Sequence, residues 1–166
     1  MFQKVSSRHF LKEKEAKKLL KDFCEKVRVD INRFFKLEQT VEVAETEVTK
    51  IFIVDAKPLF AKSKNLLFPT LLFHELLPIL PRVVVDEGAI PHVCGGADIM
   101  VPGVVNVEGD FEQNDLVAVV DEKHGKVLAI GVALFNSRDV KNLKRGKIVK
   151  NIHYVGDKLW NLIRKF

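Results

Sequence analysis

The chain has 166 residues, and its 27 Lys and Arg against 22 Asp and Glu give a formal net charge of +5. Hydrophobic residues make up 47% and charged residues 30%, which is typical of a globular protein and excludes a disordered chain. The start of the chain is dense with charge, and the longest apolar run, residues 66–81, contains charged and proline residues, so we expect neither a signal peptide nor a membrane span. Two cysteines are too few for a disulfide scaffold or a cysteine-based zinc site.

The first part of the chain predicts a strand and a long helix. Residues 2–5 are expected to form a short strand. Apolar side chains then recur at three- and four-residue spacing among lysines, which predicts an amphipathic helix over residues 11–27 with Cys24 on its apolar side. Phe34 and Phe35 follow, and we expect both to be buried.

A run of strands comes next. These strands cover residues 41–45, 51–54 and 59–61. Lys57–Pro58 suits the turn before the last of them, and Thr70 suits the cap of a short helix that ends near Leu77. Pro78 and Pro81 end that helix, because proline lacks the amide hydrogen that a helix interior requires. We therefore place a domain boundary near Pro81, with the Phe- and Leu-rich residues before it in an interdomain core.

The second half has the pattern of a small barrel. Near-continuous Val, Leu and Ile predict its strands, over residues 82–86, 116–120, 127–134 and 148–152. A short helix is expected over residues 87–94, where Gly95-Gly96 stops it, and a tight turn over Met100–Gly103. Residues 121–126 predict a hairpin loop, and a terminal helix is expected over residues 158–163.

The net charge is unevenly distributed along the chain. It amounts to +6 over residues 1–36, −2 over 37–81, −6 over 82–137 and +7 over 138–166. If the two basic ends meet in space, they form one basic face, which is the electrostatic footprint of a nucleic-acid binder. The alternative is two separate, solvated basic faces.

The sequence carries no recognisable catalytic or metal site. No serine or cysteine lies in a nucleophile motif, and we interpret Cys94 as a packing residue and nearby His92 as a surface residue. The five histidines are scattered without metal-binding spacing, and Gly95-Gly96 lacks the lysine and hydroxyl of a phosphate-binding loop. We therefore expect no enzyme activity, no metal and no cofactor.

A cluster of small residues and a later basic run form the candidate binding site. The small residues are Gly88, Ala89, Gly95, Gly96 and Ala97. Small side chains let another backbone approach, and exposed amides after a helix face phosphate oxygens. The basic side chains that supply the countercharge are Lys141, Lys144, Arg145, Lys147 and Lys150. Without this basic run, the glycines would be interpreted as turn residues.

Two motifs in this region resemble the PUA domain, a small barrel named for pseudouridine synthases and archaeosine transglycosylases. They are Asp-x-Gly-Ala-Ile at residues 86–90 and Val-x-x-Gly-Ala-x-Ile-Met-x-Pro-Gly-Val at residues 93–104. Further motifs lie at residues 1–4, 68–71, 79–81, 151–154 and 159–160. Together they make the whole chain similar to the malignant T-cell-amplified-sequence family, also called translation-machinery-associated PUA proteins, and to its archaeal members.

This resemblance implies an α+β fold in which a small mixed α/β N-terminal (pre-PUA) domain, residues 1–80, packs on a C-terminal PUA pseudo-β-barrel, residues 81–166, with a terminal helix. It implies a non-enzymatic, RNA-binding translation factor that associates with the small ribosomal subunit and tRNA in initiation, re-initiation or recycling. We expect a cytoplasmic monomer that binds rRNA or tRNA, with a density-regulated-protein-like partner.

The resemblance also implies where RNA binds. The small residues named above correspond to the helix-to-strand turn that holds RNA in PUA complexes, and residues 148–152 correspond to the final strand. Lys144, Arg145, Lys147 and Lys150 are added from their charge. Because residues 82–137 are acidic, RNA contact must use the final strand and the N-terminal helix, or the main partner is a protein. The alternative function is an RNA-targeting subunit of a modification system, such as pseudouridine or archaeosine formation.

Overall fold

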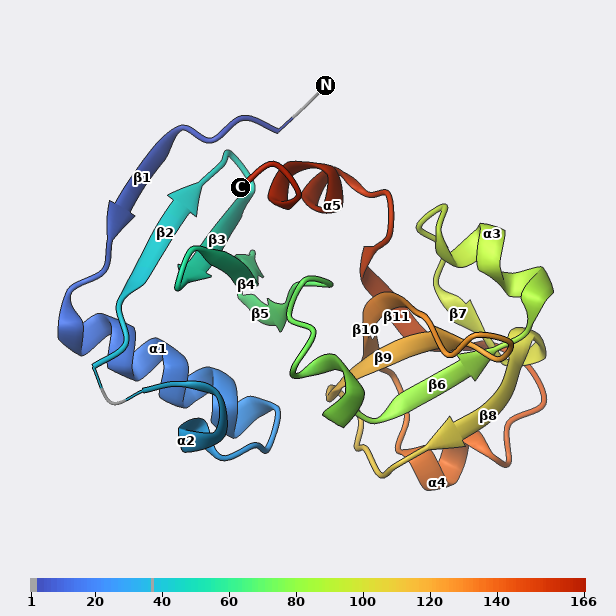
Figure 1. Ribbon diagram of the computed structural model, residues 1–166. Coiled ribbons are helices and arrows are strands. Elements are labelled where there is room, and N and C mark those ends of the chain that lie inside the picture. Colours follow the sequence, from blue (N-terminus) through green and yellow to red (C-terminus); the bar gives the residue numbers. More distant parts are fainter. Residues whose placement is uncertain (1–2, 37) are drawn as a thin grey trace.

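Two β-sheets make up most of the protein, which the computed structural model describes over residues 3–36 and 38–166 (Figure 1). The first sheet is antiparallel, with its strands in the order β1-β2-β3-β4-β5. They are β1 (Ser7–Phe10), β2 (Val41–Glu45), β3 (Thr49–Val54), β4 (Lys57–Ser63) and β5 (Leu66–Pro69). The second sheet has the order β7-β11-β10-β9-β6-β8. Its strands are β6 (Arg82–Val85), β7 (Ile99–Met100), β8 (Val104–Glu108), β9 (Leu116–Asp121), β10 (Val127–Ala133) and β11 (Lys147–Tyr154).

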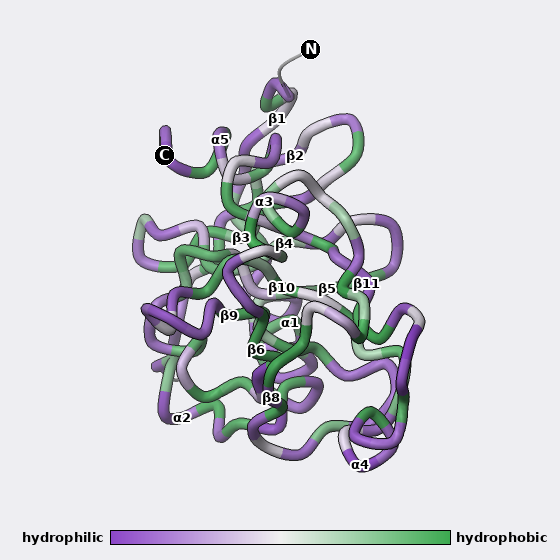
Figure 2. The backbone as a smooth tube through the Cα atoms, turned by 90° about the vertical axis from the view of Figure 1, so that its right-hand side faces the viewer, coloured by the Kyte–Doolittle hydropathy of each residue, from purple (hydrophilic) through white to green (hydrophobic). Residues whose placement is uncertain are grey.

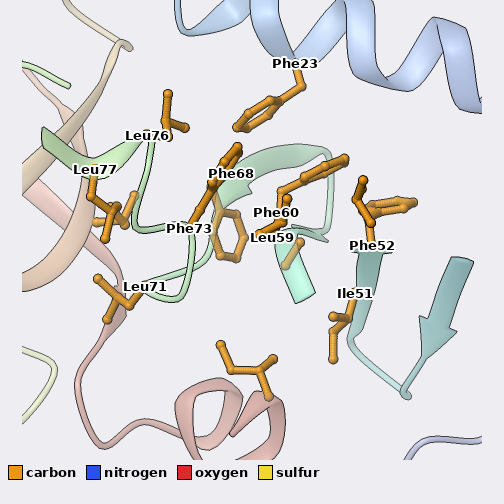
Figure 3. Packing of buried hydrophobic residues seen from close by; sticks show 14 of the residues in the cluster. Phe23, Ile51, Phe52, Leu59, Phe60, Phe68, Leu71, Phe73, Leu76 and Leu77 are labelled. Atoms are coloured by element: carbon orange, nitrogen blue, oxygen red, sulfur yellow. The ribbon is translucent and has the colours of Figure 1, made fainter. Parts of the chain in front are cut away.

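The predicted N-terminal helix is confirmed as α1 (Glu13–Lys26), which packs on the first sheet through a cluster of phenylalanines. The Phe23 ring stacks on Phe60 with ring centroids 4.8 Å apart, and Phe52 stacks on the same ring at 5.3 Å (Figure 3). Cys24 is buried beside them, and burial raises the pKa of its thiol to about 11, so it acts as an apolar packing residue. A single-turn helix, α2 (Ile31–Phe34), follows. Phe35 is buried as expected, whereas Phe34 is only partly buried.

The first strand does not lie where the sequence predicts it. Residues 3–5 are outside any strand, residues 1–2 fall outside the described residues, and β1 instead spans residues 7–10. All four side chains of β1 are exposed, because β1 is the edge of its sheet and pairs only with β2. An edge strand without a buried face has no alternation of apolar and polar residues to reveal it.

Two further expectations in the first half are wrong. The turn between β3 and β4 is Asp55–Ala56, with φ values of 49° and 64°, and Pro58 is buried inside β4. The helix expected from Thr70 to Leu77 is a series of turns that ends in a short 3₁₀ helix, η1 (Leu77–Ile79). The buried Thr70 hydroxyl donates a hydrogen bond to the Pro58 carbonyl oxygen at 2.6 Å, so this side chain ties the segment to β4.

The second sheet is curled (Figure 1). Its central strands β9 and β10 are buried along nearly their whole length. On β9, Val117 and Val119 contribute to the core inside the curl, whereas Leu116, Ala118 and Val120 contribute to the core shared with the first sheet. This double burial explains why β9 is a continuous apolar run. In Figure 2 the course of β6 and β9 is coloured mainly as hydrophobic. The mixed α+β fold with a C-terminal barrel-like sheet is as predicted.

Short helices connect these strands. They are η2 (Glu87–Ala89), α3 (Ile90–Val93), η3 (Val101–Gly103), α4 (Ser137–Val140) and α5 (Lys158–Ile163). The terminal helix is confirmed, but its Leu159 and Ile163 side chains pack into the core of the first sheet. The chain therefore returns from the second sheet to the first at its C-terminal end (Figure 1).

The two basic ends of the chain meet only in part: the Arg8 guanidinium of β1 lies 5.3 Å from the centroid of the Phe166 ring, whereas α1 and the loop before β11 lie apart. Helix α1 covers one side of the first sheet and α5 covers the other (Figures 1 and 3). The loop between α4 and β11 lies at the far end of the second sheet from α1 (Figure 1). The single basic face expected from net charge is therefore wrong for α1, because segments that are alike in charge are separated by the two sheets. The basic residues before and within β11 therefore lie on a surface that does not include α1.

Candidate nucleic-acid interface

A groove of about 370 Å³ opens at the end of β6, between the helical segment 87–93 and the turn 97–103. Three of the small residues predicted for the site line it, namely Gly88, Ala89 and Ala97. The other lining side chains are mostly apolar. Asp86, Asp98 and His92 are its titratable lining residues. The predicted segments thus enclose a hollow whose walls carry short side chains.

Asp86 and Gly103 hold the two walls of the groove together. One carboxylate oxygen of Asp86 accepts a hydrogen bond from the Ala89 amide at 2.9 Å, and the Asp86 amide donates to the Gly103 carbonyl oxygen, also at 2.9 Å. A Cβ atom at Gly103 would lie 3.1 Å from the Ala89 Cβ, so a larger side chain at either position would push the walls apart. Small residues are needed here because the backbones approach closely.

Gly95 and Gly96 do not line the groove; they shape the turn behind it. Gly96 has a φ of +93°, and a Cβ at this position would lie 3.0 Å from the Tyr154 hydroxyl oxygen. The Ala97 amide donates to the His92 carbonyl oxygen at 3.0 Å, which closes the end of α3. These glycines therefore let the turn pass beneath the Tyr154 ring on β11.

Asn151 fastens that turn to β11. Its side-chain nitrogen donates to the carbonyl oxygens of Val93 and Ala97, each at 3.0 Å, and its backbone amide donates to Asp98 at 2.8 Å. Asn151 belongs to one of the family motifs and to residues 148–152, the predicted RNA-holding strand, but the sequence does not single it out within that strand. Asn151 is only partly exposed on β11, and a partly buried amide side chain is expected to find hydrogen-bond partners.

The Asp98 carboxylate also binds Lys147. The Lys147 ammonium lies 2.7 Å from the second carboxylate oxygen. Burial disfavours the charged form of Asp98, but the bonds from Lys147 and Asn151 outweigh it, so the pKa of this carboxyl lies below its usual value. Asp98 therefore stays ionised, and it positions Lys147 at the rim of the groove.

The four basic residues predicted for the site lie on or directly before β11. Lys147 and Lys150 are exposed on the strand, and Lys144 and Arg145 are exposed in the loop that leads into it. This loop is joined to the groove, because the Val101 amide donates to the Gly146 carbonyl oxygen at 2.9 Å. Glu108 lies opposite Arg82, at the end of β6 away from the groove. Of the acidic side chains in residues 82–137, Glu108 is therefore remote from this rim, whereas Asp86 and Asp98 line the groove itself.

The described residues contain no group of three or more His, Cys, Asp or Glu side chains placed to hold a metal ion. Burial raises the pKa of the Cys94 thiol above its usual value, which disfavours the reactive thiolate. Within the described part of the chain, no helix is both long and apolar enough to cross a membrane.

Comparison with known families matches both parts of the chain. Residues 81–155 match the PUA domain, and residues 7–74 match a family described as a domain of unknown function (DUF1947). The chain is 39% identical over 158 residues to an uncharacterised protein of Methanocaldococcus jannaschii, covering 95% of this chain and 97% of that protein. It is 31% identical to translation machinery-associated protein 20 of Saccharomyces cerevisiae, covering 87% and 83%. Malignant T-cell-amplified sequence 2 of Homo sapiens is 33% identical, covering 80% and 76%.

Solved structures agree with these matches. A hypothetical protein from Pyrococcus horikoshii superimposes with a TM-score of 0.82 at 36% identity, covering 95% of this chain and 99% of that one. A PUA-domain protein from Aeropyrum pernix also gives a TM-score of 0.82, at 27% identity, covering 98% and 92%.

The curled sheet and the match over residues 81–155 define a PUA-domain protein, and PUA domains bind RNA. The chain belongs to the family of translation machinery-associated protein 20 and the malignant T-cell-amplified sequence proteins. The resemblance inferred from the sequence motifs is therefore confirmed.

Proposed function

We propose that this protein is a non-enzymatic RNA-binding translation factor that associates with the small ribosomal subunit and tRNA in initiation, re-initiation or recycling. The observation that carries the proposal is the groove at the end of β6, which has small-residue walls and lies beside the basic strand β11. The names of its relatives support a role in translation.

The chemistry of the site suits an RNA backbone. Short side chains at Gly88, Ala89 and Ala97 leave room for a sugar-phosphate chain to approach the groove. Four basic side chains are exposed along the adjoining strand and loop, where they would neutralise phosphates. They are Lys144, Arg145, Lys147 and Lys150. Because phosphate contacts release counterions, binding should weaken steeply as salt is added.

The proposal extends to the organisation of the molecule. We divide the chain into a pre-PUA domain, residues 1–80, and a PUA domain, residues 81–166, which act in the cytoplasm as a monomer. RNA binds to the second domain, and the first is available to the subunit or to a density-regulated-protein-like partner.

A double charge reversal tests the site. Lys144→Glu with Arg145→Glu should abolish co-sedimentation with purified small ribosomal subunits and lower the affinity for tRNA, because two phosphate contacts become repulsive. The slope of log affinity against log salt should fall by about 0.7 to 0.9 for each phosphate that the variant no longer neutralises. Fluorescence anisotropy with labelled tRNA over a salt series measures this slope.

The matched control is Lys62→Glu with Lys64→Glu, which makes the same change in net charge on the exposed hairpin of β4 and β5 in the first sheet. This variant should bind tRNA with wild-type affinity, because RNA binds to the second domain. Retention of small-subunit binding by the Lys144→Glu, Arg145→Glu variant would show that the site has been assigned to the wrong surface.

A further inference from the structure

A basic hollow lies on the first sheet, which does not carry the groove. It has a volume of about 300 Å³ and opens between the turn that joins β2 to β3 and the turn that joins β4 to β5. Three lysines and one glutamate supply its charged lining side chains, so the lining has a net charge of +2. They are Lys50, Lys62, Lys64 and Glu47. Such a lining attracts anions.

The strand register sets two of these lysines against each other. Lys50 on β3 is directly opposite Lys62 on β4, and like charges at directly opposed positions destabilise a strand pair. Lys50 is compensated on its other flank by Glu45, whose carboxylate lies 3.1 Å from the Lys50 ammonium. Lys62 has Leu67 on its other flank. Within residues 3–36 and 38–166, neither Lys62 nor Lys64 forms an ion pair, so two cations at the hollow lack a counterion.

Lys64 also occupies a backbone position that does not suit a lysine. Ser63 pairs with Leu66, so Lys64 and Asn65 form a two-residue turn. The φ of Lys64 is 54°, in the left-handed region that favours glycine and asparagine. The chain therefore holds an exposed lysine at the hollow where another residue would fit the turn better. Local strain of this kind is found at functional sites, and it points to a role for the charge.

We propose that the hollow between these two turns is a binding site for a phosphate group. A bound phosphate supplies the missing countercharge to Lys62 and Lys64 and removes the repulsion between Lys62 and Lys50. The exposed Asn65 side chain adds an amide donor for a phosphate oxygen. Glu47 opposes an anion, so the site binds phosphate weakly.

This inference goes beyond the proposed function, because the hollow and the groove have no lining residue in common. The phosphate group is either free phosphate or a phosphate of the small subunit's RNA, to which the proposed function leaves the first domain available. Both sources present the same oxygens and the same charge to the three lysines.

An NMR titration of the full chain tests the site. When sodium phosphate replaces sodium chloride at constant ionic strength, the backbone amides of residues 46–50 and 62–65 should shift along a saturating curve. Lys62→Gln with Lys64→Asn should weaken this binding roughly tenfold, because two exposed ion pairs are lost. Asparagine suits the left-handed turn position, so the variant keeps its fold and the amide spectrum outside the hollow stays unchanged.

Lys14→Gln with Lys18→Gln is the matched control. It makes the same change in net charge on the exposed side of α1, and it should bind phosphate as the wild type does. Equal shifts in chloride and in phosphate would overturn the proposal. So would full retention of phosphate binding by the Lys62→Gln, Lys64→Asn variant.

Co-sedimentation with purified small ribosomal subunits distinguishes the two sources. Weaker co-sedimentation of the Lys62→Gln, Lys64→Asn variant assigns the phosphate to ribosomal RNA, and unchanged co-sedimentation assigns it to free phosphate. The Lys144→Glu, Arg145→Glu variant should keep the phosphate response of residues 62–65. The proposed function can therefore fail in that variant's RNA assays while the hollow still binds phosphate, and the reverse result is equally distinct.

Discussion

Gly131 on β10 is the glycine at which an added Cβ atom would come closest to a neighbouring strand. A Cβ atom there would lie 2.2 Å from Val149 Cγ1 and 2.8 Å from the Lys150 carbonyl oxygen. The pairing of β10 with β11 is irregular at this point, between Ile130 and Gly131. The carbonyl oxygen belongs to the backbone and has no rotamer to change, so β11 itself would have to move.

Gly131→Ala should therefore lower the free energy of unfolding by about 1 to 3 kcal/mol, the usual cost of overpacking a core. Urea denaturation followed by circular dichroism measures it. Because the displaced strand carries Lys147 and Lys150, RNA affinity should fall as well.

Gly125→Ala is the control for this substitution. Gly125 has a φ of +64°, but nothing lies within 4 Å of the Cβ that it would gain. Gly125→Ala should lower the free energy of unfolding by about 1 kcal/mol, through backbone strain alone, and should leave RNA affinity unchanged. Equal effects of the two substitutions would contradict the assigned contact with β11.

Some residues of the candidate site can be predicted from the sequence, and others cannot. Small residues and lysines of the candidate site stand out by composition and motif, so Gly88, Ala89 and Lys147 were all identified. Met100 lines the groove but is not assigned to binding from the sequence, because an exposed apolar residue looks the same in the sequence as a buried one. Only the strand register shows that Met100 lies opposite Lys147.

At the scale of elements, Asp157 joins the end of β11 to the start of α5. One of its carboxylate oxygens accepts a hydrogen bond from the Trp160 amide at 2.6 Å. The other accepts from the Tyr154 amide at 3.0 Å and lies 2.8 Å from Nδ1 of the buried His153. Burial disfavours the ionised form, but the bonds from His153 and from the two amides outweigh it, so the pKa of Asp157 lies below its usual value.

Asp157→Asn should destabilise the protein at neutral pH by about 1 to 3 kcal/mol, because an amide NH₂ group then faces buried donors. The carboxylate stabilises the fold fully above the ordinary carboxyl pKa, and its contribution is lost as the pH falls through the lowered value. The difference in the free energy of unfolding between wild type and variant should therefore become smaller as the pH falls below about 4. Urea denaturation at a series of pH values measures it.

Asp30→Asn provides the comparison for this prediction. Asp30 caps α2 by accepting a hydrogen bond from the Asn32 amide at 2.9 Å, and it is exposed. Asparagine caps helices about as well as aspartate, so this variant should be close to wild type at every pH. A pH-independent deficit in Asp157→Asn would show that the charge of Asp157 is not what stabilises α5.

Elements with a buried stripe were predicted well, and exposed elements were not. Helix α1 has apolar residues at helical spacing, and β9 and β10 are apolar runs joined by a loop that contains Gly125. Strands β1 and β8 are edges with mostly exposed side chains, so the expected pattern is absent. The parallel pairing of β6 with β9 joins segments more than thirty residues apart, and no local signal encodes it.

At the scale of the whole molecule, one hydrophobic core contains residues from both sheets. Val84, Leu116 and Ile130 of the second sheet region belong to the same buried cluster as Phe23 and Phe60 of the first. The cluster also includes Leu159 and Ile163 of α5. The Arg28 guanidinium after α1 adds an ion pair to Asp115 before β9, with nitrogen and oxygen 2.9 Å apart.

We therefore expect the protein to unfold as one unit. Ile163→Ala should lower stability by about 2 to 5 kcal/mol, the usual range for truncating a buried isoleucine. Because the core is shared, hydrogen exchange should accelerate in β9 and β10 as well as in β2 and β3. Native-state exchange monitored by NMR resolves the two sheets separately.

Val105→Ala is the control, because Val105 is exposed on β8 and should leave exchange in both sheets nearly unchanged. If Ile163→Ala accelerates exchange in the first sheet alone, the two sheets are separate cooperative units and the shared core does not couple them.

The helix α5 also constrains how the protein meets a large target. It returns from β11 to the first sheet, so the groove and that sheet keep a constant spacing and angle. A target that touches both must present its own two contact points at that same separation. An RNA assembly whose parts shift relative to one another would meet this requirement in one arrangement only. The protein would then discriminate between states of its target by geometry, without reading additional bases.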